Sequence, residues 1–361
     1  MLFNLLTSFI DHYSFLNVFK YLTFRTGLSV VTSLITVFII GGPLIRIFSE
    51  NMISGPIRQD GPIDHIIKKS GTPTMGGVII IIGMLTGTLL WADLNNIYIW
   101  TLVFVSLSLG LLGFADDLLK IKFKNSRGLN PKLKFFGQLI IAFLALFILI
   151  KFSDHEYLYN LYFPFFKNLI WQMGLFFIPF GLFVIIGASN AVNLTDGLDG
   201  LATVPVMLVA LSFTLISYVV GNTIFSEYLQ LQYIPNVGEL SIFCGSIVGS
   251  CLGFLWYNAP PAKIFMGDTG SLSLGGSLAA VAIIAKHEIV LAIIGGLFVL
   301  ETVSVIIQVI SFKLTGKRIF KMAPIHHHFE QKGWAESTIV IRFWIIAIIL
   351  ALVGLATLKL R

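Results

Sequence analysis

The sequence predicts an all-α fold, a polytopic membrane protein with about ten transmembrane helices in one domain over residues 1–361. Of its 361 residues, 56% are hydrophobic and only 12% are charged, whereas a soluble domain carries roughly 25% charged residues. Apolar runs close to the ~20 residues that cross a bilayer recur along the whole chain. Such a chain has too few polar side chains to cover a water-facing surface.

Ten apolar segments are expected to span the membrane: 22–45, 75–92, 97–115, 135–152, 170–187, 201–220, 240–257, 271–285, 289–312 and 338–358. The first twenty residues lack the basic start and cleavage site of a signal peptide, and we expect them to lie at the membrane interface. Two cysteines, Cys244 and Cys251, stand seven apart in one span. We expect them to be reduced thiols in the core rather than a disulfide or metal pair.

The loops between ten spans alternate between two sides of the membrane, and Lys and Arg are unevenly divided between them. One side holds 17 of the 24 basic residues and the other 7. The positive-inside rule places the richer side in the cytoplasm and both termini outside. The loops rich in Asp, Asn, Gly and His all fall on the richer side, where they can form one site. The net charge of +6 does not indicate nucleic-acid binding, because the basic residues form no stripe or recognisable module.

Residues 68–77, which lead into the second span, are basic and rich in hydroxyls and glycines. Side chains such as Lys69 and Thr74 can hold an anion there. The segment is not a Walker loop, because the spacing from glycine to lysine is wrong.

Two adjacent carboxylates, Asp116 and Asp117, follow the apolar run that ends at Ala115. A carboxylate at mid-bilayer costs about 2.5–3.5 kcal/mol, and less near the interface, so this pair needs a partner or a function. Successive helical side chains diverge by about 100°, which favours different tasks for the two, such as one near a metal or an attacking group. The alternative is a helix-end pair solvated by water and by Lys120 or Lys122.

Residues 190–200 combine two carboxamides, Asn190 and Asn193, with two carboxylates, Asp196 and Asp199. The carboxylates, three apart, would share a helix face. A helix-loop-helix calcium site needs more oxygen ligands and a terminal Glu, so substrate hydroxyls, a uracil-type amide or a Mg²⁺ shell fit better. A helix cap for the span that begins near 200 is the alternative.

Residues 258–271 place glycines and hydroxyls directly before another apolar span. The backbone N–H groups and positive dipole end of such a helix start commonly hold phosphate. Asp268, in the same turn, would repel phosphate unless a cation lay between them. Mg²⁺ resolves that conflict, because it takes one or two carboxylates together with phosphate oxygens. The alternative is Asp268 as a helix N-cap without a metal.

Three consecutive histidines, His326, His327 and His328, occupy a basic loop late in the chain. They cannot all bind one zinc ion in ordinary geometry, and no cysteine lies nearby to complete a structural site. Next to several lysines and an arginine, they can instead bind the phosphates of an anionic substrate. A solvated polar loop is the alternative.

Five segments in order resemble those of the polyprenyl-phosphate N-acetylhexosamine-1-phosphate transferases: 71–77, 113–117, 190–200, 258–271 and 324–330. The resemblance covers nearly the whole chain, and no motif position departs from the family's pattern. Each segment alone is moderately specific, and five in order are very specific. The histidine run that continues into Phe329 and Glu330 points to the muramoyl branch of the family.

The resemblance implies transfer of phospho-MurNAc-pentapeptide from UDP-MurNAc-pentapeptide to undecaprenyl phosphate, giving lipid I and UMP with Mg²⁺ required. This is the first membrane step of peptidoglycan synthesis. The resemblance also implies a homodimer with ten spans in the bacterial inner membrane, a cytoplasmic active site and periplasmic termini. Exchange between a diphosphate and a phosphate needs charge neutralisation and in-line positioning more than a strong acid or base.

By matching motif positions, the resemblance assigns catalysis to Asp116, Asp117, Asp268 and His326. Asp268 would bind Mg²⁺, Asp116 would act on the lipid phosphate or the metal, and Asp117 would support them. The substrate-binding residues around uridine would be Lys69, Asp199, Asn258 and Phe265, with Phe265 stacked on uracil. Thr74, Asn193 and Asp196 would lie near the sugar and diphosphate, and Asn190 would also bind substrate. His327 and His328 would lie beside His326 at phosphate or sugar.

Two other functions stay open on the sequence alone. The first is transfer of GlcNAc-1-phosphate to a polyprenyl phosphate, for which the site would be almost unchanged and the donor different. The second is a secondary transporter, which also shows broken helices and intramembrane carboxylates. A transporter would need polar residues near mid-span, whereas here they lie at one edge.

Overall fold

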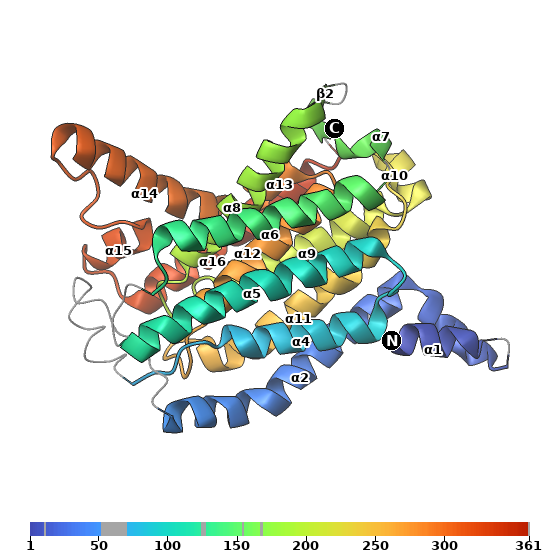
Figure 1. Cartoon of the computed structure of the whole chain (residues 1–361), viewed down its shortest axis with the longest axis horizontal. Coiled ribbons are helices and arrows are strands. Elements are labelled where there is room, and N and C mark those ends of the chain that lie inside the picture. Colours follow the sequence, from blue (N-terminus) through green and yellow to red (C-terminus); the bar gives the residue numbers. More distant parts are fainter. Residues whose placement is uncertain (11, 52–70, 124–127, 154, 167–168, 360–361) are drawn as a thin grey trace.

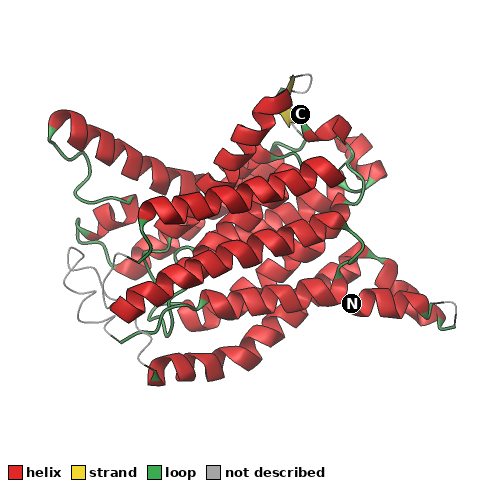
Figure 2. Ribbon diagram, viewed as in Figure 1, coloured by secondary structure: helices red, strands yellow, loops and turns green. Residues whose placement is uncertain are grey.

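The computed structural model describes the chain except residues 11, 52–70, 124–127, 154, 167–168 and 360–361. Its described part is helical apart from one short hairpin (Figure 2). The longer helices are α2 Leu22–Glu50, α4 Gly77–Trp91, α5 Ile97–Phe123, α6 Pro131–Phe152, α8 Phe177–Thr195, α9 Thr203–Val220, α11 Leu240–Asn258, α12 Gly267–Ile284, α14 Gly296–Thr315 and α16 Glu336–Ala356.

The remaining elements are short. They are α1 Leu2–Ser8, η1 Ser14–Lys20, α7 His155–Leu158, β1 Asn160–Tyr162, β2 Ile170–Gln172, η2 Gly174–Phe176, α10 Thr223–Leu229, η3 Val237–Glu239, α13 Glu288–Ile294 and α15 Ile325–Glu330. The two strands pair antiparallel, with Leu161 opposite Trp171.

Nine helices in the described part of the chain are long and apolar enough to cross a membrane. They correspond to nine of the ten predicted spans, and the tenth, predicted at 75–92, is the 15-residue helix α4. The predicted all-α, multi-pass architecture is therefore confirmed. Cys244 and Cys251 are buried free thiols in α11, as expected.

Two predicted spans have different boundaries in the structure. The span predicted at 170–187 begins as strand β2, and its helix α8 runs to Thr195. The span predicted at 289–312 is broken at Gly295 into α13 and α14. The first shift carries residues 190–195 onto a helix, and the second leaves α14 projecting away from the bundle in Figure 1.

Helix α12 lies at the centre of the bundle, packed chiefly against α5 and α8. Its residues are 89% buried, the largest share among the membrane-sized helices. Glycines allow two neighbours to approach its backbone. A Cβ at Gly77 would lie 2.0 Å from the Gly270 nitrogen, and one at Gly113 would lie 2.2 Å from the Asp268 carbonyl oxygen. The start of α12 is therefore held between α4 and α5.

Both chain termini lie at one end of the bundle, and α15 lies at the other (Figure 1). An ion pair fastens the terminal end. Arg25 donates from Nη1 to Glu239 Oε2 at 2.9 Å and to the Trp91 carbonyl oxygen at 3.1 Å, while its Nη2 lies 2.6 Å from Glu239 Oε1. This pair joins α2, α4 and the start of α11. These helices are therefore fixed relative to one another at the end of the bundle opposite the candidate site.

Candidate functional site

Three carboxylates meet where α5 and α12 cross, and we call Asp116, Asp117 and Asp268 the acidic cluster. Each offers an oxygen within 4.8 Å of the others, although Asp268 stands about 150 residues away in sequence. Asp116 and Asp117 are 2% and 3% exposed. The cluster can hold a metal ion, because hard cations bind carboxylate oxygens.

Asp117 fixes the start of α12. Its Oδ2 accepts hydrogen bonds from the Thr269 backbone N–H at 3.0 Å and the Thr269 hydroxyl at 2.8 Å, and its Oδ1 accepts from the Asp268 N–H at 3.3 Å. The first N–H groups of a helix need acceptors outside it. A carboxylate from α5 supplies them here.

Asp116, by contrast, faces two lysines. Its Oδ2 lies 2.6 Å from Lys120 Nζ and 3.9 Å from Lys134 Nζ, and its Oδ1 accepts from the Leu129 N–H at 2.8 Å. Asp116 and Asp117 thus have different partners, as their angular separation on the helix predicts. Of the alternative, solvation by water is wrong, because both side chains are buried, whereas the contact with Lys120 is present, at 2.6 Å from Asp116 and 3.6 Å from Asp117.

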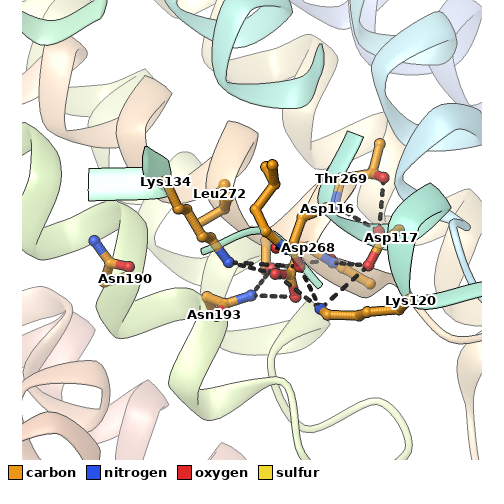
Figure 3. A network of polar contacts seen from close by, with 12 residues as sticks. Asp116, Asp117, Lys120, Lys134, Asn190, Asn193, Asp268, Thr269 and Leu272 are labelled. Atoms are coloured by element: carbon orange, nitrogen blue, oxygen red, sulfur yellow. Dashed lines mark hydrogen bonds and ion pairs between the residues drawn. The ribbon is translucent and has the colours of Figure 1, made fainter. Parts of the chain in front are cut away.

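Asp268 lies at the centre of the polar contacts in Figure 3. Its Oδ2 contacts Lys134 Nζ and lies 3.0 Å from Lys120 Nζ, and its Oδ1 accepts from Asn193 Nδ2 at 2.9 Å. It does not cap α12, since the N-cap position is Met266. The side chain instead turns toward α6 and α8.

The helix start does not offer free N–H groups to phosphate, which corrects one expectation. Asp117 accepts from the N–H groups of Asp268 and Thr269, and Asp196 lies near that of Gly267. A phosphate at this place would therefore depend on the lysines and a cation rather than on the helix dipole.

Asn190 and Asn193 lie on the last turns of α8 and not in a loop. Asn193 also donates to the Ser271 hydroxyl at 2.9 Å, and Asn190 donates to Gln138 Oε1 at 2.9 Å. The extension of α8 beyond its predicted end thus brings both carboxamides to the side of the acidic cluster.

Residues 196–200 form a turn between α8 and α9, which we call the substrate loop. Asp196 and Asp199 therefore do not share a helix face, and neither caps α9, whose N-cap is Ala202. Burial, followed by the charges of Asp268 and Asp117, raises the pKa of Asp196 to about 7. Asp199 accepts from the Ala262 N–H at 2.9 Å, which ties the loop to residues 258–265.

The residues expected around uridine share one region. Asn258 is buried, donates to the Ile264 carbonyl oxygen at 2.9 Å and accepts from the Thr203 hydroxyl at 2.8 Å. Phe265 is partly exposed, and its backbone pairs with the segment that contains Thr74. Lys69 lies outside the described residues.

Thr74 lies beside the acidic cluster. Gly267 has a left-handed backbone, with φ +73°, and a Cβ there would lie 2.6 Å from Asp117 Oδ2 and 3.0 Å from Thr74 Oγ1. Only glycine combines that backbone with this space. Thr74 and Asp117 therefore meet at the first residue of α12.

The three histidines differ in environment. His326 is 0% exposed, and its Nδ1 lies 3.1 Å from Glu301 Oε2, so the ring does not reach a surface. His327 Nδ1 lies 2.6 Å from Glu330 Oε2. His328 accepts at Nδ1 from the Lys321 N–H, and burial with nearby Lys332 and Lys321 lowers its pKa. Both observations favour neutral His328 at pH 7.

A cavity of about 910 Å³ opens beside the acidic cluster. Its polar lining includes Asp116, Lys120, Lys134, Asn190, Asn193 and Asp268, and its apolar lining includes Phe135, Leu139, Leu182, Phe183 and Ile186. Along α8 the lining changes from Asn193 to Leu182, a rise of about 16 Å at 1.5 Å per residue. The cavity therefore fits a molecule with an anionic head and a hydrocarbon tail.

Sequence reasoning did not assign a role in the site to Lys134, Gln138 or Glu301. Lys134 and Gln138 follow an Asn-Pro helix start and look like ordinary interfacial residues. The sequence could have indicated a role for Glu301, since an acidic side chain inside an apolar span rarely lacks a partner or a function.

Known proteins resemble this chain over its whole length. Residues 99–286 match the family model described as Glycosyl transferase family 4, and residues 69–81 match phospho-N-acetylmuramoyl-pentapeptide-transferase signature 1. The chain is 68% identical over the full length of both proteins to the phospho-N-acetylmuramoyl-pentapeptide-transferase of Pelagibacter ubique (strain HTCC1062). It is 57% identical to that of Phenylobacterium zucineum (strain HLK1), covering 96% of this chain and 95% of the relative.

A membrane-helix bundle with carboxylates and lysines gathered at one end, matched to glycosyl transferase family 4, defines the class as a membrane-embedded phosphoglycosyl transferase. Within that class, the chain belongs to the phospho-N-acetylmuramoyl-pentapeptide-transferase family.

Proposed function

We propose that this protein transfers phospho-MurNAc-pentapeptide from UDP-MurNAc-pentapeptide to undecaprenyl phosphate, forming lipid I and UMP in peptidoglycan synthesis. The observation that carries the proposal is the cavity whose lining passes from the acidic cluster and two lysines to an apolar wall along α8. A lipid phosphate can place its head between the lysines and its first prenyl units against that wall.

In the reaction, an oxygen of the lipid phosphate attacks the phosphorus joined to the sugar, and the bond from that phosphorus to the UMP oxygen breaks. The second pKa of a phosphomonoester is about 6, so the acceptor needs little help to lose a proton at pH 7. The task of the protein is to place two anions together. Lys120 and Lys134, both lining the cavity, would hold the acceptor phosphate and offset its charge.

The acidic cluster fits Mg²⁺, because its oxygen donors lie together beside a phosphate-sized space. Asp268 and Asp116 would hold the ion, and Asp117 would support them by fixing the start of α12. Bound Mg²⁺ supplies neutralisation of diphosphate charge. Lys120 and Lys134, which now contact Asp268, would then be available to phosphate.

The donor would lie on the other side of the cluster. Asp199, Asn258, Phe265 and Lys69 would surround uridine, and His327 and His328 would lie toward the sugar and its phosphate. Thr74 and Asp196 would lie near the sugar and diphosphate. Asn190 and Asn193, which line the acceptor cavity, would approach the donor from that side. Support comes from the contacts that join the substrate loop to residues 258–265 and to Gly267.

The proposed setting is the bacterial inner membrane, with the whole chain acting as one domain in a homodimer. The active site would face the cytoplasm and both termini the periplasm. Two observations support this orientation: the termini share one end of the bundle (Figure 1), and most basic residues belong to loops of the other side.

The test is UMP release from UDP-MurNAc-pentapeptide by purified protein in detergent, with undecaprenyl phosphate and Mg²⁺ each omitted in turn. Release that needs all three components is expected. UDP-GlcNAc is assayed in parallel, because release from that donor alone would assign the protein to GlcNAc-1-phosphate transfer. No release from either donor would overturn the proposal and favour a carrier.

A further inference from the structure

Glu301 and His326 form a buried pair behind the substrate loop. Glu301 lies in α14 and His326 in α15, and both side chains are 0% exposed. The Nδ1 of His326 lies 3.1 Å from Oε2 of Glu301. A buried carboxylate on a membrane-spanning helix is costly unless it is paired or functional, so this contact has a purpose beyond packing.

The other edge of the imidazole faces the substrate loop. A Cβ at Gly197 would lie 2.3 Å from His326 Nε2. The ring therefore fills the space that a side chain at position 197 would need. Nε2 of His326 and Oε1 of Glu301 have no hydrogen-bond partner among the residues that the structure describes. Among the described residues, the contact between Nδ1 and Oε2 is thus the one hydrogen bond that holds the imidazole.

The loop continues this connection on both sides of Gly197. Asp196, directly before it, lies near the Gly267 N–H at the start of α12, which lowers its pKa against the effect of burial. Asp199, two residues after it, accepts from the Ala262 N–H at 2.9 Å. Displacement of the imidazole would therefore move both carboxylates expected to face the donor.

We propose that Glu301 is a positioning residue that acts through His326. Glu301 accepts the Nδ1–H of His326 and holds the ring, and the ring holds the substrate loop against the start of α12 and against segment 258–265. Neither side chain touches substrate, since both are fully buried. The inference rests on the proposed function in one respect, that the substrate loop serves the donor.

A double-mutant cycle tests whether Glu301 acts through His326. Glu301→Ala and His326→Ala are each expected to lower kcat/KM for UDP-MurNAc-pentapeptide by about 10- to 100-fold, as partners that orient an active-site group do. The double variant is expected to stay within about two-fold of His326→Ala. Losses that multiply in the double variant would overturn the inference.

The kinetic constants separate positioning from general damage. In Glu301→Ala, kcat/KM for the donor is expected to fall, while the KM for the acceptor, undecaprenyl phosphate, stays within about two-fold of wild type. Glu301→Gln, whose amide oxygen still accepts the Nδ1–H, is expected to recover to within about five-fold of wild type. A loss confined to the acceptor KM, or a Gln variant as poor as Ala, would contradict the proposal.

Hydrogen exchange supplies a readout that does not depend on turnover. Amides of residues 196–200 are expected to exchange faster in Glu301→Ala than in wild type, or in Glu301→Leu, which also lacks the acceptor, if the alanine variant does not fold. Glu301→Gln should exchange like wild type. Glu288→Gln, which alters another buried carboxylate at the α12–α13 junction, is the matched control and should leave that loop unchanged. Unchanged exchange in both Glu301→Ala and Glu301→Leu would overturn the inference, whereas inactive wild-type protein would count against the proposed function alone.

Discussion

One oxygen of Asp117 accepts both the backbone N–H and the hydroxyl of Thr269, at 3.0 and 2.8 Å. A carboxylate on α5 therefore holds the first turn of α12. That turn contains Asp268, which contacts both Lys120 and Lys134. The position of Asp268 depends on a neighbour in the cluster as much as on its own helix.

Asp117→Asn is expected to lower both the unfolding temperature and kcat, the latter by about 100-fold. Hydrogen bonds to a charged group contribute about 1.5–3 kcal/mol, and a carboxamide cannot replace both acceptor oxygens. Thermal unfolding in detergent and UMP release measure the two effects. Thr269→Val, which removes only the hydroxyl donor, should show a smaller loss. A wild-type unfolding temperature for Asp117→Asn would contradict this role.

Asp268→Ala is expected to abolish transfer and Mg²⁺ binding together, because it removes the carboxylate at the centre of the cluster. Turnover across a Mg²⁺ titration, with metal binding measured by calorimetry, checks both. Glu50→Gln, an exposed carboxylate paired with Arg46, is the control. Mg²⁺-dependent turnover that survives in Asp268→Ala would rule out its assignment as a ligand.

Lys134→Met and Lys120→Met are each expected to raise the KM for undecaprenyl phosphate by about 10-fold, a change of about 1.4 kcal/mol in binding. Methionine keeps much of the side-chain length and removes the charge. Lys122 has an exposed side chain on α5, the helix of Lys120, so Lys122→Met should leave the KM for undecaprenyl phosphate near the wild-type value. If the donor KM rose instead, the lysines would belong to the diphosphate.

Gly113→Ala is expected to unfold the site, since its Cβ would lie 2.2 Å from the Asp268 carbonyl oxygen, a backbone atom that has no rotamer to change. Gly27→Ala in α2 is the matched control, because its Cβ would meet nothing within 4 Å. Alanine is the better helix former, so the control should unfold at the wild-type temperature or above. Equal unfolding temperatures for both variants would refute the close helix contact.

The raised pKa of Asp196 predicts a pH dependence of stability in metal-free buffer. Because the folded-state pKa of about 7 exceeds the ordinary value of 3.8 for an aspartate, the folded state binds the proton more tightly than the unfolded state does. The stability from this group is complete below pH 4 and is lost as pH rises through 7. The unfolding temperature of wild type should therefore fall between pH 5 and 8, and that of Asp196→Asn should fall less over the same range. Parallel curves for the two proteins would contradict the shift.

Hydropathy predicted where the helices lie, and tertiary contacts determined where they end. A continuous apolar run hides the break at Gly295, since α13 and α14 are both apolar. The extension of α8 to Thr195 includes two asparagines, which are poor helix formers. Both gain partners from neighbouring helices, Gln138 for Asn190 and Asp268 for Asn193, and no local pattern announces those contacts.

The site was predictable in its residue types and less so in its contacts. The cost of carboxylates at the end of an apolar run marked Asp116 and Asp117, and the conflict with phosphate at a helix start marked Asp268. The structure places all three together. That Asp117 takes the N–H groups expected to bind phosphate depends on the close approach of α5 and α12. Lys134 likewise reaches Asp268 only because α6 folds back along α5.

The central place of α12 has a consequence for how the protein is made. At a mean hydropathy of 1.2 it is the least hydrophobic of the membrane-sized helices, and it is rich in glycine and serine. Small residues favour contact between helices more than contact with lipid. Its entry into the bilayer during synthesis therefore relies on contacts with α5 and α8, which are synthesised before it. The carboxylates of α5 are already in the membrane when Asp268 arrives, so the active centre assembles as a late step of insertion.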